Sequence, residues 1–291
     1  MSARELGGRE AAAALQCEVE AAVRALGAAP RLAVFAPATD EASAHYGRMI
    51  TRMAAKVGIE VNLHEFDPAA GSDNLRRALQ EAAASGVHGI QVHKPLPQGG
   101  TLSALLEEFE AEDVEGLGPR HVGRLLAGRA QCVPCTALAV WRLLQWHGIA
   151  LDGQRALVLG RSDIVGAPLA VLLQQSGATV TVAHTRTRDL ATLVSGSDLV
   201  ISAAGQRDLF LPEALTPHSV LADVGHHVLP DGSVRGDFSA AHHARASAFT
   251  PVPGGVGPLT TICLLEAVTR AAAQALGKPT SLADPRRPFH P

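Results

Sequence analysis

The sequence predicts an α/β protein with two domains, each built on a mainly parallel β-sheet with flanking helices. The first observation is an alternation of apolar, strand-like runs with helix-like segments, which is typical of parallel sheets joined by helical crossovers. The second is that this alternation occurs twice, over residues 5–109 and again from residue 153 onward. The third is the length of the chain, because 291 residues suffice for two domains of ordinary size.

The first alternation contains three predicted strands. The run 31–36 is continuously apolar, so we expect a strand that is buried on both faces. Asp40 or Ser43 is expected to cap the helix that follows, and Gly58 to end it. In chain order the predicted elements are a helix over 5–26, a strand over 31–36, a helix up to Val57, a strand over 59–63, a helix over 74–85, a strand over 89–93 and a helix over 102–109.

The second alternation follows a helix predicted from Cys135 through Trp146. Its predicted strands lie near 156–159, 179–183, 198–202 and 219–224, with helices between them, and a last helix is predicted over 259–276. We expect that last helix to return to the first domain. The first domain is therefore placed at residues 1–138 plus 259–291 and the second at 139–258, with a frayed, proline-rich tail after Gly277.

A glycine-rich loop joins the first strand and helix of the second domain. Gly160 and Gly166 bracket this loop, in which Ser162 stands where a dinucleotide fingerprint would have another glycine. Such a loop points backbone N–H groups and a helix N-terminus at one spot, which suits a phosphate. The second domain is therefore predicted to be of the Rossmann type, an ordinary strand-to-helix turn being the alternative. The predicted cofactor-binding residues in this loop are Gly160, Arg161, Ser162, Ile164, Val165 and Gly166.

The turn after the next strand indicates which nucleotide is bound. Thr185, Arg186, Thr187 and Arg188 follow that strand, and no acidic residue precedes Asp189. An acid at this place favours NAD, whereas a basic or hydroxyl cluster accommodates a 2′-phosphate. The sequence therefore favours NADP as cofactor, with Thr185 and Arg186 as its ligands, and a solvated charged turn as the alternative.

Composition excludes several classes of function. Apolar residues make up 47% of the chain and the net charge is −3, which favours neither nucleic acid nor an anionic membrane as a partner. No apolar run approaches the roughly 20 residues that span a bilayer, and no secretory leader is evident at residues 1–5. Cys132 and Cys135 have metal or redox spacing, but no second pair completes a zinc site, so a structural turn is expected and no metal. We expect a cytoplasmic protein.

Several motifs together resemble one family, the bifunctional methylenetetrahydrofolate dehydrogenase/methenyltetrahydrofolate cyclohydrolases. The motifs that resemble the family lie at residues 91–97, 113–116, 134–136, 160–168, 184–187 and 250–258, in the family's order. The resemblance implies a homodimer that works in one-carbon metabolism. It also implies oxidation of 5,10-methylenetetrahydrofolate by hydride transfer to NADP, then hydrolysis of the methenyl product to 10-formyltetrahydrofolate.

The resemblance also places substrate-site residues, and here the chain departs from the family. Tyr46 matches a tyrosine that stacks on the folate, but the lysine expected four residues later is Ile50. The family's glutamine is His93, followed by Lys94, and the aspartate that binds the pterin is Glu115.

Two further motifs complete the comparison with the family. The resemblance assigns Pro253, Gly254 and Gly255 to substrate binding. It also places His226 in a loop that touches the nicotinamide half of the cofactor. A cleft between the two domains is expected to bring the cofactor to the substrate.

These departures leave four interpretations of the function. Isoleucine neither donates nor accepts a proton, so the first is an NADP-dependent dehydrogenase without the family's lysine-based hydrolysis. The second is the full bifunctional enzyme, with His93 or Lys94 replacing the lysine. The third is a non-catalytic paralogue that binds NADP or folate, and the fourth an oxidoreductase acting on another small substrate.

Overall fold

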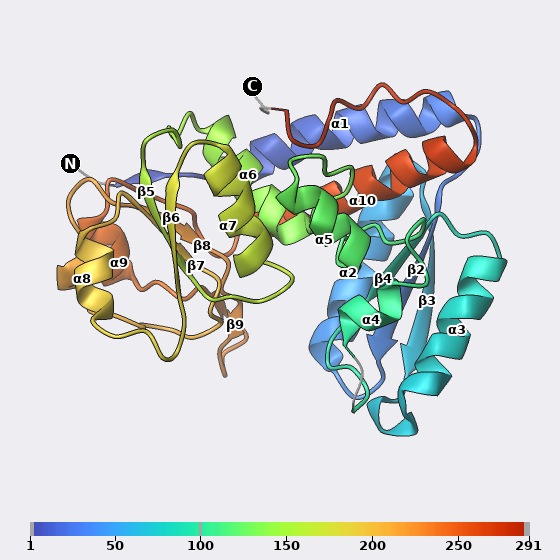
Figure 1. Cartoon of the computed structure of the whole chain (residues 1–291), viewed down its shortest axis with the longest axis horizontal. Coiled ribbons are helices and arrows are strands. Elements are labelled where there is room, and N and C mark those ends of the chain that lie inside the picture. The colour runs from blue at the N-terminus through green and yellow to red at the C-terminus, as the bar shows by residue number, and fades with distance from the viewer. Residues whose placement is uncertain (1–2, 99–100, 288–291) are drawn as a thin grey trace. The chain divides into compact units, whose positions relative to one another are not determined.

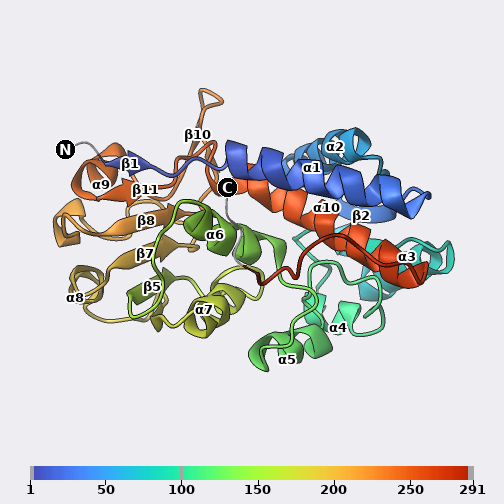
Figure 2. The ribbon, with the colours of Figure 1, turned by 90° about the horizontal axis from the view of Figure 1, so that it is seen from above.

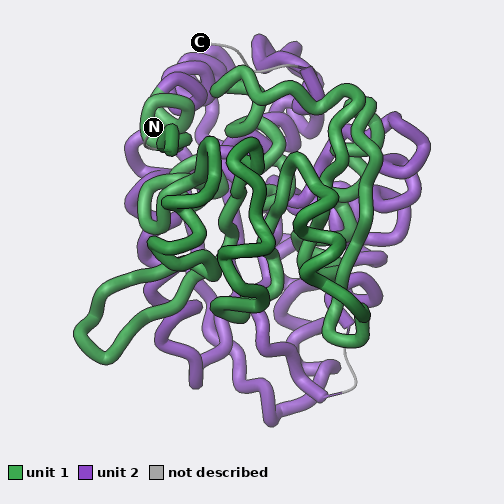
Figure 3. Tube along the Cα trace, turned by 90° about the vertical axis from the view of Figure 1, so that its left-hand side faces the viewer, with its two compact units in different colours: residues 1–13, 135–260, 288–291 green, residues 14–134, 261–287 purple. Residues whose placement is uncertain are grey.

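The computed structural model describes residues 3–98 and 101–287, which form two compact units (Figure 3). Unit 1 comprises Met1–Ala13 and Cys135–Thr260, and unit 2 comprises Ala14–Pro134 and Thr261–Arg287, apart from residues outside the described ranges. Each unit is an α/β structure with its own parallel sheet, as the sequence predicts.

Unit 2 is built on a sheet of three parallel strands in the order β3-β2-β4. The central strand β2, Arg31–Pro37, is buried from its second residue to its end, in agreement with its continuous apolar run. Its neighbours are β3, Glu60–Phe66, and β4, Gly89–Val92. Helix α3, Ser72–Ala84, connects β3 to β4 across the sheet (Figure 1).

Helix α2, Glu41–Val57, carries residues of the predicted substrate site, and its two ends follow the sequence signals. Asp40 caps it by accepting a hydrogen bond from the Ser43 backbone N–H at 3.1 Å. Gly58 ends it with φ of 82°, in the left-handed region that glycine adopts without strain. The rest of unit 2 contains a 3₁₀ turn η1, Pro68–Ala70, and the helices α4, Leu102–Leu106, and α5, Pro119–Leu126. Helix α4 ends earlier than the predicted 109, because the chain turns there and Phe109 donates its N–H to Leu106.

Two long helices run through unit 2. Helix α1 is Arg9–Leu26 and helix α10 is Val256–Ala275, and both views of the ribbon show them side by side (Figures 1 and 2). Leu26 packs with Ala272 and Ala273 in a buried cluster between them. Among the described residues, α10 is the one helix long and apolar enough to cross a membrane, contrary to the expectation that no such run exists. Of its most apolar window, 67% is buried inside the protein, as in a core helix.

Unit 1 contains a sheet of six strands in the order β1-β11-β8-β7-β5-β6, with every pairing parallel. The first strand of its alternation, β5, lies between β6 and β7, so the chain leaves β5 towards opposite edges of the sheet. Ligands of open α/β sheets bind beyond the carboxyl end of the strands at this kind of switch point. The strands are β1, Arg4–Glu5; β5, Arg155–Leu159; β6, Thr179–Ala183; β7, Leu199–Ser202; β8, Val220–Asp223; and β11, Ala248–Phe249.

The remaining elements of unit 1 are short or lie beside this sheet. Helix α6 ends where the sequence predicts, at Trp146. The elements are α6, Cys135–Trp146; α7, Gly166–Gln175; α8, Leu190–Ser195; η2, Pro212–Ala214; α9, Ala240–Arg245; and a hairpin of β9, His227–Val228, with β10, Val234–Arg235.

The described residues up to Ala13 belong to unit 1, whereas the sequence analysis placed all of residues 1–138 in the other domain. Strand β1 pairs with β11, and the Leu6 N–H donates to the Phe249 carbonyl at 2.7 Å. Helix α1 accordingly begins at Arg9 rather than near residue 5. A strand of two residues is too short to show a periodicity of its own. The helical pattern that follows it therefore led to a predicted helix that begins too early. Residues 278–287, expected to fray, instead pack on the protein, since Leu282 is 5% exposed.

Candidate cofactor and substrate sites

Two glycines shape the loop after β5, and each is required by a close backbone approach. Gly160 has φ of 114°, and a Cβ there would lie 2.4 Å from the Ala203 carbonyl oxygen beyond β7. A Cβ on Gly166 would lie 2.1 Å from the Gly160 carbonyl oxygen. Any larger residue at either position would push the loop away from the switch point. The spacing of the two glycines in the sequence therefore has a steric cause in this structure.

The loop between these glycines leads directly into α7. The Ser162 hydroxyl accepts the Val165 N–H at 3.2 Å and the Gly166 N–H at 3.4 Å. Arg161 and Ser162 are exposed, and Ile164 and Val165 are partly exposed. The positive end of the helix dipole at the start of α7 attracts an anion. This arrangement fits the phosphates of a nucleotide cofactor at the end of β5.

The turn after β6 holds the residues predicted to read the cofactor's ribose. The Thr187 hydroxyl accepts the His184 N–H at 2.9 Å, and the His184 ring accepts the Arg186 N–H at 3.1 Å. Thr185 and Arg186 are exposed, and the Arg186 guanidinium has no hydrogen bond or ion pair within the described residues. A fixed turn that carries an unpaired guanidinium suits a phosphate on the ribose.

Two buried aspartates, which the sequence reasoning did not single out, hold the loop after β8. The Asp223 carboxylate accepts N–H groups from Gly225 at 2.8 Å, Asp237 at 3.0 Å and Phe238 at 2.9 Å. Asp237 accepts the Ser202 hydroxyl at 2.6 Å. Burial raises the pKa of Asp223, and the three backbone N–H groups act in the opposite direction. These carboxylates therefore define the path of residues 223–238.

The two histidines of this loop have different environments. The His227 ring lies 2.6 Å from the Asp237 carboxylate, which fixes its orientation. His226, the residue predicted to face the cofactor, is exposed. The sequence shows only that each aspartate has a glycine nearby, and the structure gives the reason for these glycines. A Cβ on Gly225 would lie 2.3 Å from Asp237, and one on Gly236 would lie 2.1 Å from Asp223.

The predicted substrate segment Pro253–Gly255 lies in a tight turn before α10. The Gly255 N–H donates to the Pro251 carbonyl at 2.8 Å, and a Cβ on Gly255 would lie 2.6 Å from that same oxygen. Gly254 has φ of 111°, and its carbonyl accepts the Gly8 N–H at 2.8 Å. Pro253 is exposed. The segment is thus fixed by backbone contacts, with its proline at the surface.

Tyr46 and Ile50 lie one turn apart on α2 and have different surroundings. Tyr46 is half-buried, whereas Ile50 is 0% exposed and lies on the buried face with Ala54 and Val57. A lysine at this position would have to bring its ammonium out of an apolar core. The structure therefore closes position 50 to proton chemistry in the native chain.

His93 follows β4 and is 8% exposed. Its Nε2 lies 3.4 Å from the Gln91 amide oxygen, and its Nδ1 is buried without a hydrogen-bond partner within the described residues. Its ring centroid lies 5.2 Å from that of Tyr46, at 33° between the ring planes. Burial lowers the pKa of His93 to about 4, against the opposing effects of the Ser43 backbone and the Asp40 charge. The imidazole is thus neutral near pH 7.

Lys94, the next residue, is exposed. Its carbonyl oxygen accepts the Ser43 hydroxyl at 3.2 Å, and this bond ties the end of β4 to the start of α2. His93 and Tyr46 are therefore brought together by the structure, as predicted for one site, while the Lys94 side chain is at the surface.

Glu115 lies in a turn organised by Asp113. The Asp113 carboxylate accepts N–H groups from Glu115 at 3.2 Å, Gly116 at 2.8 Å and Gly118 at 2.7 Å. Asp113 forms a parallel bridge with Ile90, so this turn lies beside the strand that ends at His93. Glu115 itself is half-buried. The backbone geometry of the turn is thus independent of the carboxylate that the family resemblance assigns to the substrate.

Cysteines and metal-ligating residues form no centre in the described part of the chain. No group of three or more His, Cys, Asp or Glu side chains could hold a metal ion there. All four cysteines are free. Burial raises the pKa of the Cys132 thiol well above its usual value, so this thiol is protonated at neutral pH.

Comparison with known proteins agrees with the geometry of both units. Residues 6–114 match the family model "Tetrahydrofolate dehydrogenase/cyclohydrolase, catalytic domain", and residues 134–276 match "Tetrahydrofolate dehydrogenase/cyclohydrolase, NAD(P)-binding domain". Bifunctional protein FolD 1 of Rhodococcus jostii is 41% identical over 275 residues, which cover 92% of this chain and 93% of that protein. Bifunctional protein FolD of Roseiflexus castenholzii is 40% identical over 290 residues, which cover 96% of this chain and 99% of that protein.

A solved structure shows the same fold. The Trypanosoma brucei N5,N10-methylenetetrahydrofolate dehydrogenase-cyclohydrolase, complexed with NADP cofactor and inhibitor, superimposes with a TM-score of 0.88 at 34% identity. The match covers 94% of this chain and 99% of that one.

Proposed function

The chain belongs to the tetrahydrofolate dehydrogenase/cyclohydrolase family, and we propose that it oxidises 5,10-methylenetetrahydrofolate to 5,10-methenyltetrahydrofolate with NADP. NADP, when bound, accepts the hydride that leaves the folate's one-carbon unit. The protein's part in this step is to bind and orient the two partners, because the cofactor supplies the chemistry. No protein side chain has to give or take a proton for the hydride to move.

The observation that carries this proposal is the glycine-shaped loop at the switch point of unit 1. Gly160 and Gly166 are both required by backbone contacts closer than a Cβ allows, and the loop opens directly into α7. The turn after β6 adds the unpaired Arg186 guanidinium for a 2′-phosphate. A chain that had lost its cofactor would not need these two glycines, and this argues against a paralogue without nucleotide.

We propose that hydrolysis of the methenyl product does not use position 50. The family's lysine is replaced by Ile50, whose side chain is 0% exposed in the core of unit 2. An alkyl group cannot take a proton from water or return one to the folate nitrogen. The conclusion is a dehydrogenase in which the second reaction of the family has lost its usual proton-transfer group.

A second candidate function is the full bifunctional enzyme with His93 as the base, and one observation favours it. The Nδ1 atom of His93 is buried, has no partner and belongs to a ring next to Tyr46. Its lowered pKa of about 4 keeps the ring neutral at physiological pH, as a general base must be, but the same shift makes it a weak base. The relatives named as bifunctional FolD proteins support this alternative.

Two assays on one preparation separate the candidates. Methylenetetrahydrofolate with NADP, and separately with NAD, measures hydride transfer; methenyltetrahydrofolate alone measures hydrolysis above the uncatalysed rate. The proposal predicts faster oxidation with NADP than with NAD and hydrolysis at the uncatalysed rate. Accelerated hydrolysis that is lost in His93→Gln supports the second candidate. Cofactor binding without oxidation of the folate would contradict both and leave a binding protein or an oxidoreductase for another substrate.

We also propose that the protein is a cytoplasmic homodimer, as the family resemblance suggests. Sedimentation equilibrium of the purified protein with and without NADP tests the dimer, and fractionation of the producing cells tests the compartment. A monomer at micromolar concentration would contradict the first of these proposals, and recovery in a membrane or secreted fraction would contradict the second.

A further inference from the structure

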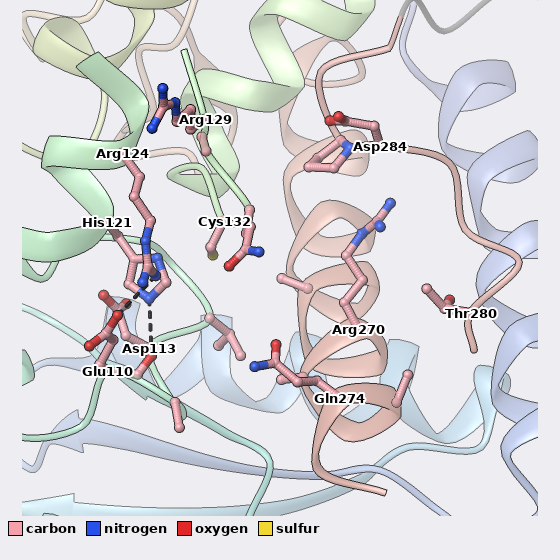
Figure 4. A pocket seen from close by; sticks show the side chains of 18 of the residues that line it. Glu110, Asp113, His121, Arg124, Arg129, Cys132, Arg270, Gln274, Thr280 and Asp284 are labelled. Atoms are coloured by element: carbon pink, nitrogen blue, oxygen red, sulfur yellow. Dashed lines mark hydrogen bonds and ion pairs between the residues drawn. The ribbon is translucent and has the colours of Figure 1, made fainter. Parts of the chain in front are cut away.

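Unit 2 contains a pocket that none of the predicted cofactor or substrate residues lines. Its volume is about 850 Å³, within the range of small-molecule sites. Four segments form it: residues 110–114, α5 with the loop that follows, the unit 2 part of α10, and the tail up to Arg286 (Figure 4). The charged residues that line it are Glu110, Asp113, Arg124, Arg129, Arg270, Lys278, Asp284 and Arg286.

Positive side chains outnumber negative ones in this pocket, and three of the five are already paired. Arg124 pairs with Glu110 at 2.9 Å, and Arg286 with Asp284 at 3.1 Å. Arg270 pairs with Glu266, behind the pocket wall, at 2.7 Å. Backbone carbonyls also accept from Arg270 and Arg286, so these two contribute mainly charge, whereas Arg124 uses only part of its guanidinium for its pair and retains donors for a ligand.

Two cations of the pocket have no acidic partner in the part of the chain that the structure describes. The Arg129 guanidinium makes no hydrogen bond or ion pair to another described residue, and it projects from the loop after α5 (Figure 4). Within the described residues, the Lys278 ammonium donates one hydrogen bond, to the Leu26 carbonyl oxygen. The remaining acid, Asp113, is held by three backbone N–H groups, and even with its charge and that of Glu266 counted, the five cations outnumber the four carboxylates. The pocket therefore has an uncompensated positive charge.

Buried polar atoms without partners also lie at this pocket. His121 is 7% exposed, and its Nε2 lies 3.0 Å from the Glu110 carbonyl, while its Nδ1 has no partner within the described residues. The Arg270 Nε is likewise buried without a partner. Figure 4 shows both side chains among the pocket-lining groups. Unsatisfied buried groups are costly, and a bound ligand is one way to satisfy them.

We propose that this pocket binds a compact polyanion, a small molecule with at least two phosphoryl or carboxylate groups. Arginine forks match both kinds of group in two-pronged contacts. Cations on α5, on its following loop and on the C-terminal tail can bind separate anionic groups of one ligand. The site is independent of the proposed reaction, since it involves neither the glycine loop of unit 1 nor Tyr46 and His93.

Titration calorimetry with the full chain tests the proposal, with inorganic pyrophosphate and tricarballylate as probes and saturating NADP present throughout. At low ionic strength we expect at least one probe to bind with a stoichiometry of one per chain. Binding should weaken as salt is added, because exposed charges are screened. A preference for pyrophosphate assigns the site to phosphoryl ligands, and a preference for tricarballylate assigns it to carboxylates.

Arg129→Glu should weaken binding by at least about tenfold, because it replaces an unpaired donor with a carboxylate that repels the anionic ligand. Arg77→Glu, the same change on the exposed face of α3, is the matched control and should leave binding within about twofold. Arg129 is exposed, so its replacement should not shift thermal unfolding; Lys278→Gln provides a second variant with the same expected direction. The proposal is overturned if neither probe binds in the presence of NADP, or if Arg129→Glu and Lys278→Gln bind as tightly as the wild type.

Discussion

The two units build their predicted ligand sites in different ways. In unit 1 the cofactor loop depends on the backbone: two glycines allow close approach, and the exposed residues Arg161 and Ser162 lead directly into the start of α7. In unit 2 the substrate site depends on side chains, and three of its four family positions carry a different residue: Ile50, His93 and Glu115. A site built from backbone atoms tolerates substitution of most of its side chains. A site built from side chains changes its chemistry with each substitution.

The proposed function follows from this difference, because the two reactions of the family place different demands on the protein. Hydride transfer needs the partners to be oriented and leaves the chemistry to the cofactor. Hydrolysis needs a group that moves a proton, and the position that should supply it is sealed in a hydrophobic core. The comparison predicts that substitutions in unit 2 change proton chemistry and stability, and that substitutions in unit 1 change cofactor binding.

The largest expected effect comes from restoring the missing lysine. Ile50→Lys should lower the free energy of unfolding by about 4 kcal/mol, because it places an ammonium where the native side chain is fully buried. Urea unfolding measures this, and Ile50→Met, which keeps the apolar character, is the control with an expected loss of about 1 kcal/mol. A stable Ile50→Lys protein would show that this face of α2 opens easily, and would weaken the contrast between the two units.

A second prediction concerns pH and His93. The folded protein holds the pKa of His93 at about 4, while the unfolded chain has the ordinary value near 6.5, so the unfolded state binds more protons between these values. Stability should therefore fall as pH decreases from about 6.5 to about 4, by about 3 kcal/mol in total from this group.

His93→Gln isolates this contribution, because glutamine does not titrate. Unfolding measured across that pH range should show a shallower decrease for the variant than for the wild type. Equal slopes for the two proteins would mean that His93 is not buried as a neutral ring, and the site in unit 2 would then be more open to water than the structure shows.

In unit 1, Gly166→Ala should weaken NADP binding by about a hundredfold, or about 2.7 kcal/mol, because the added methyl would displace the loop from the Gly160 carbonyl. Fluorescence or calorimetric titration gives the affinity. Gly196→Ala, where the nearest atom would lie 3.4 Å away, is the control and should bind NADP as the wild type does. Unchanged affinity in Gly166→Ala would contradict a backbone-built cofactor site.

The smallest expected effect is a change of cofactor preference. Arg186→Ala should weaken NADP binding by about tenfold and leave NAD binding unchanged, because only NADP has the 2′-phosphate. The measurement is the ratio of kcat/KM for the two cofactors, and Arg207→Ala, another exposed arginine of unit 1, is the control. Equal losses for NADP and NAD would mean that Arg186 acts on a part that the two cofactors share.

The same contrast describes what could be predicted from sequence. The cofactor loop was predictable because its glycines are local signals, six residues apart on either side of one turn. The Asp223–Asp237 network was not, because its partners lie on different segments and meet only in the folded chain. The position of β1 was missed for the same reason, since a strand of two residues is defined by its partner β11.

In unit 2 the sequence identified the altered residues but not their surroundings. The absence of a lysine at position 50 was visible, but the complete burial of Ile50 depends on packing across the unit. The pairing of His93 with Tyr46 follows from β4 and α2 lying together, which the Ser43–Lys94 contact secures. The pocket of unit 2 could not be foreseen, because it is closed by a tail that composition alone marks as frayed.

A single-turnover experiment tests the central claim most directly. Excess enzyme is mixed with methylenetetrahydrofolate and NADP, and methenyl- and 10-formyltetrahydrofolate are followed in time. The account predicts that methenyltetrahydrofolate accumulates to nearly the amount of substrate and then disappears at its uncatalysed rate. Formation of 10-formyltetrahydrofolate without such accumulation would contradict it, and would show that a group other than residue 50 performs the hydrolysis.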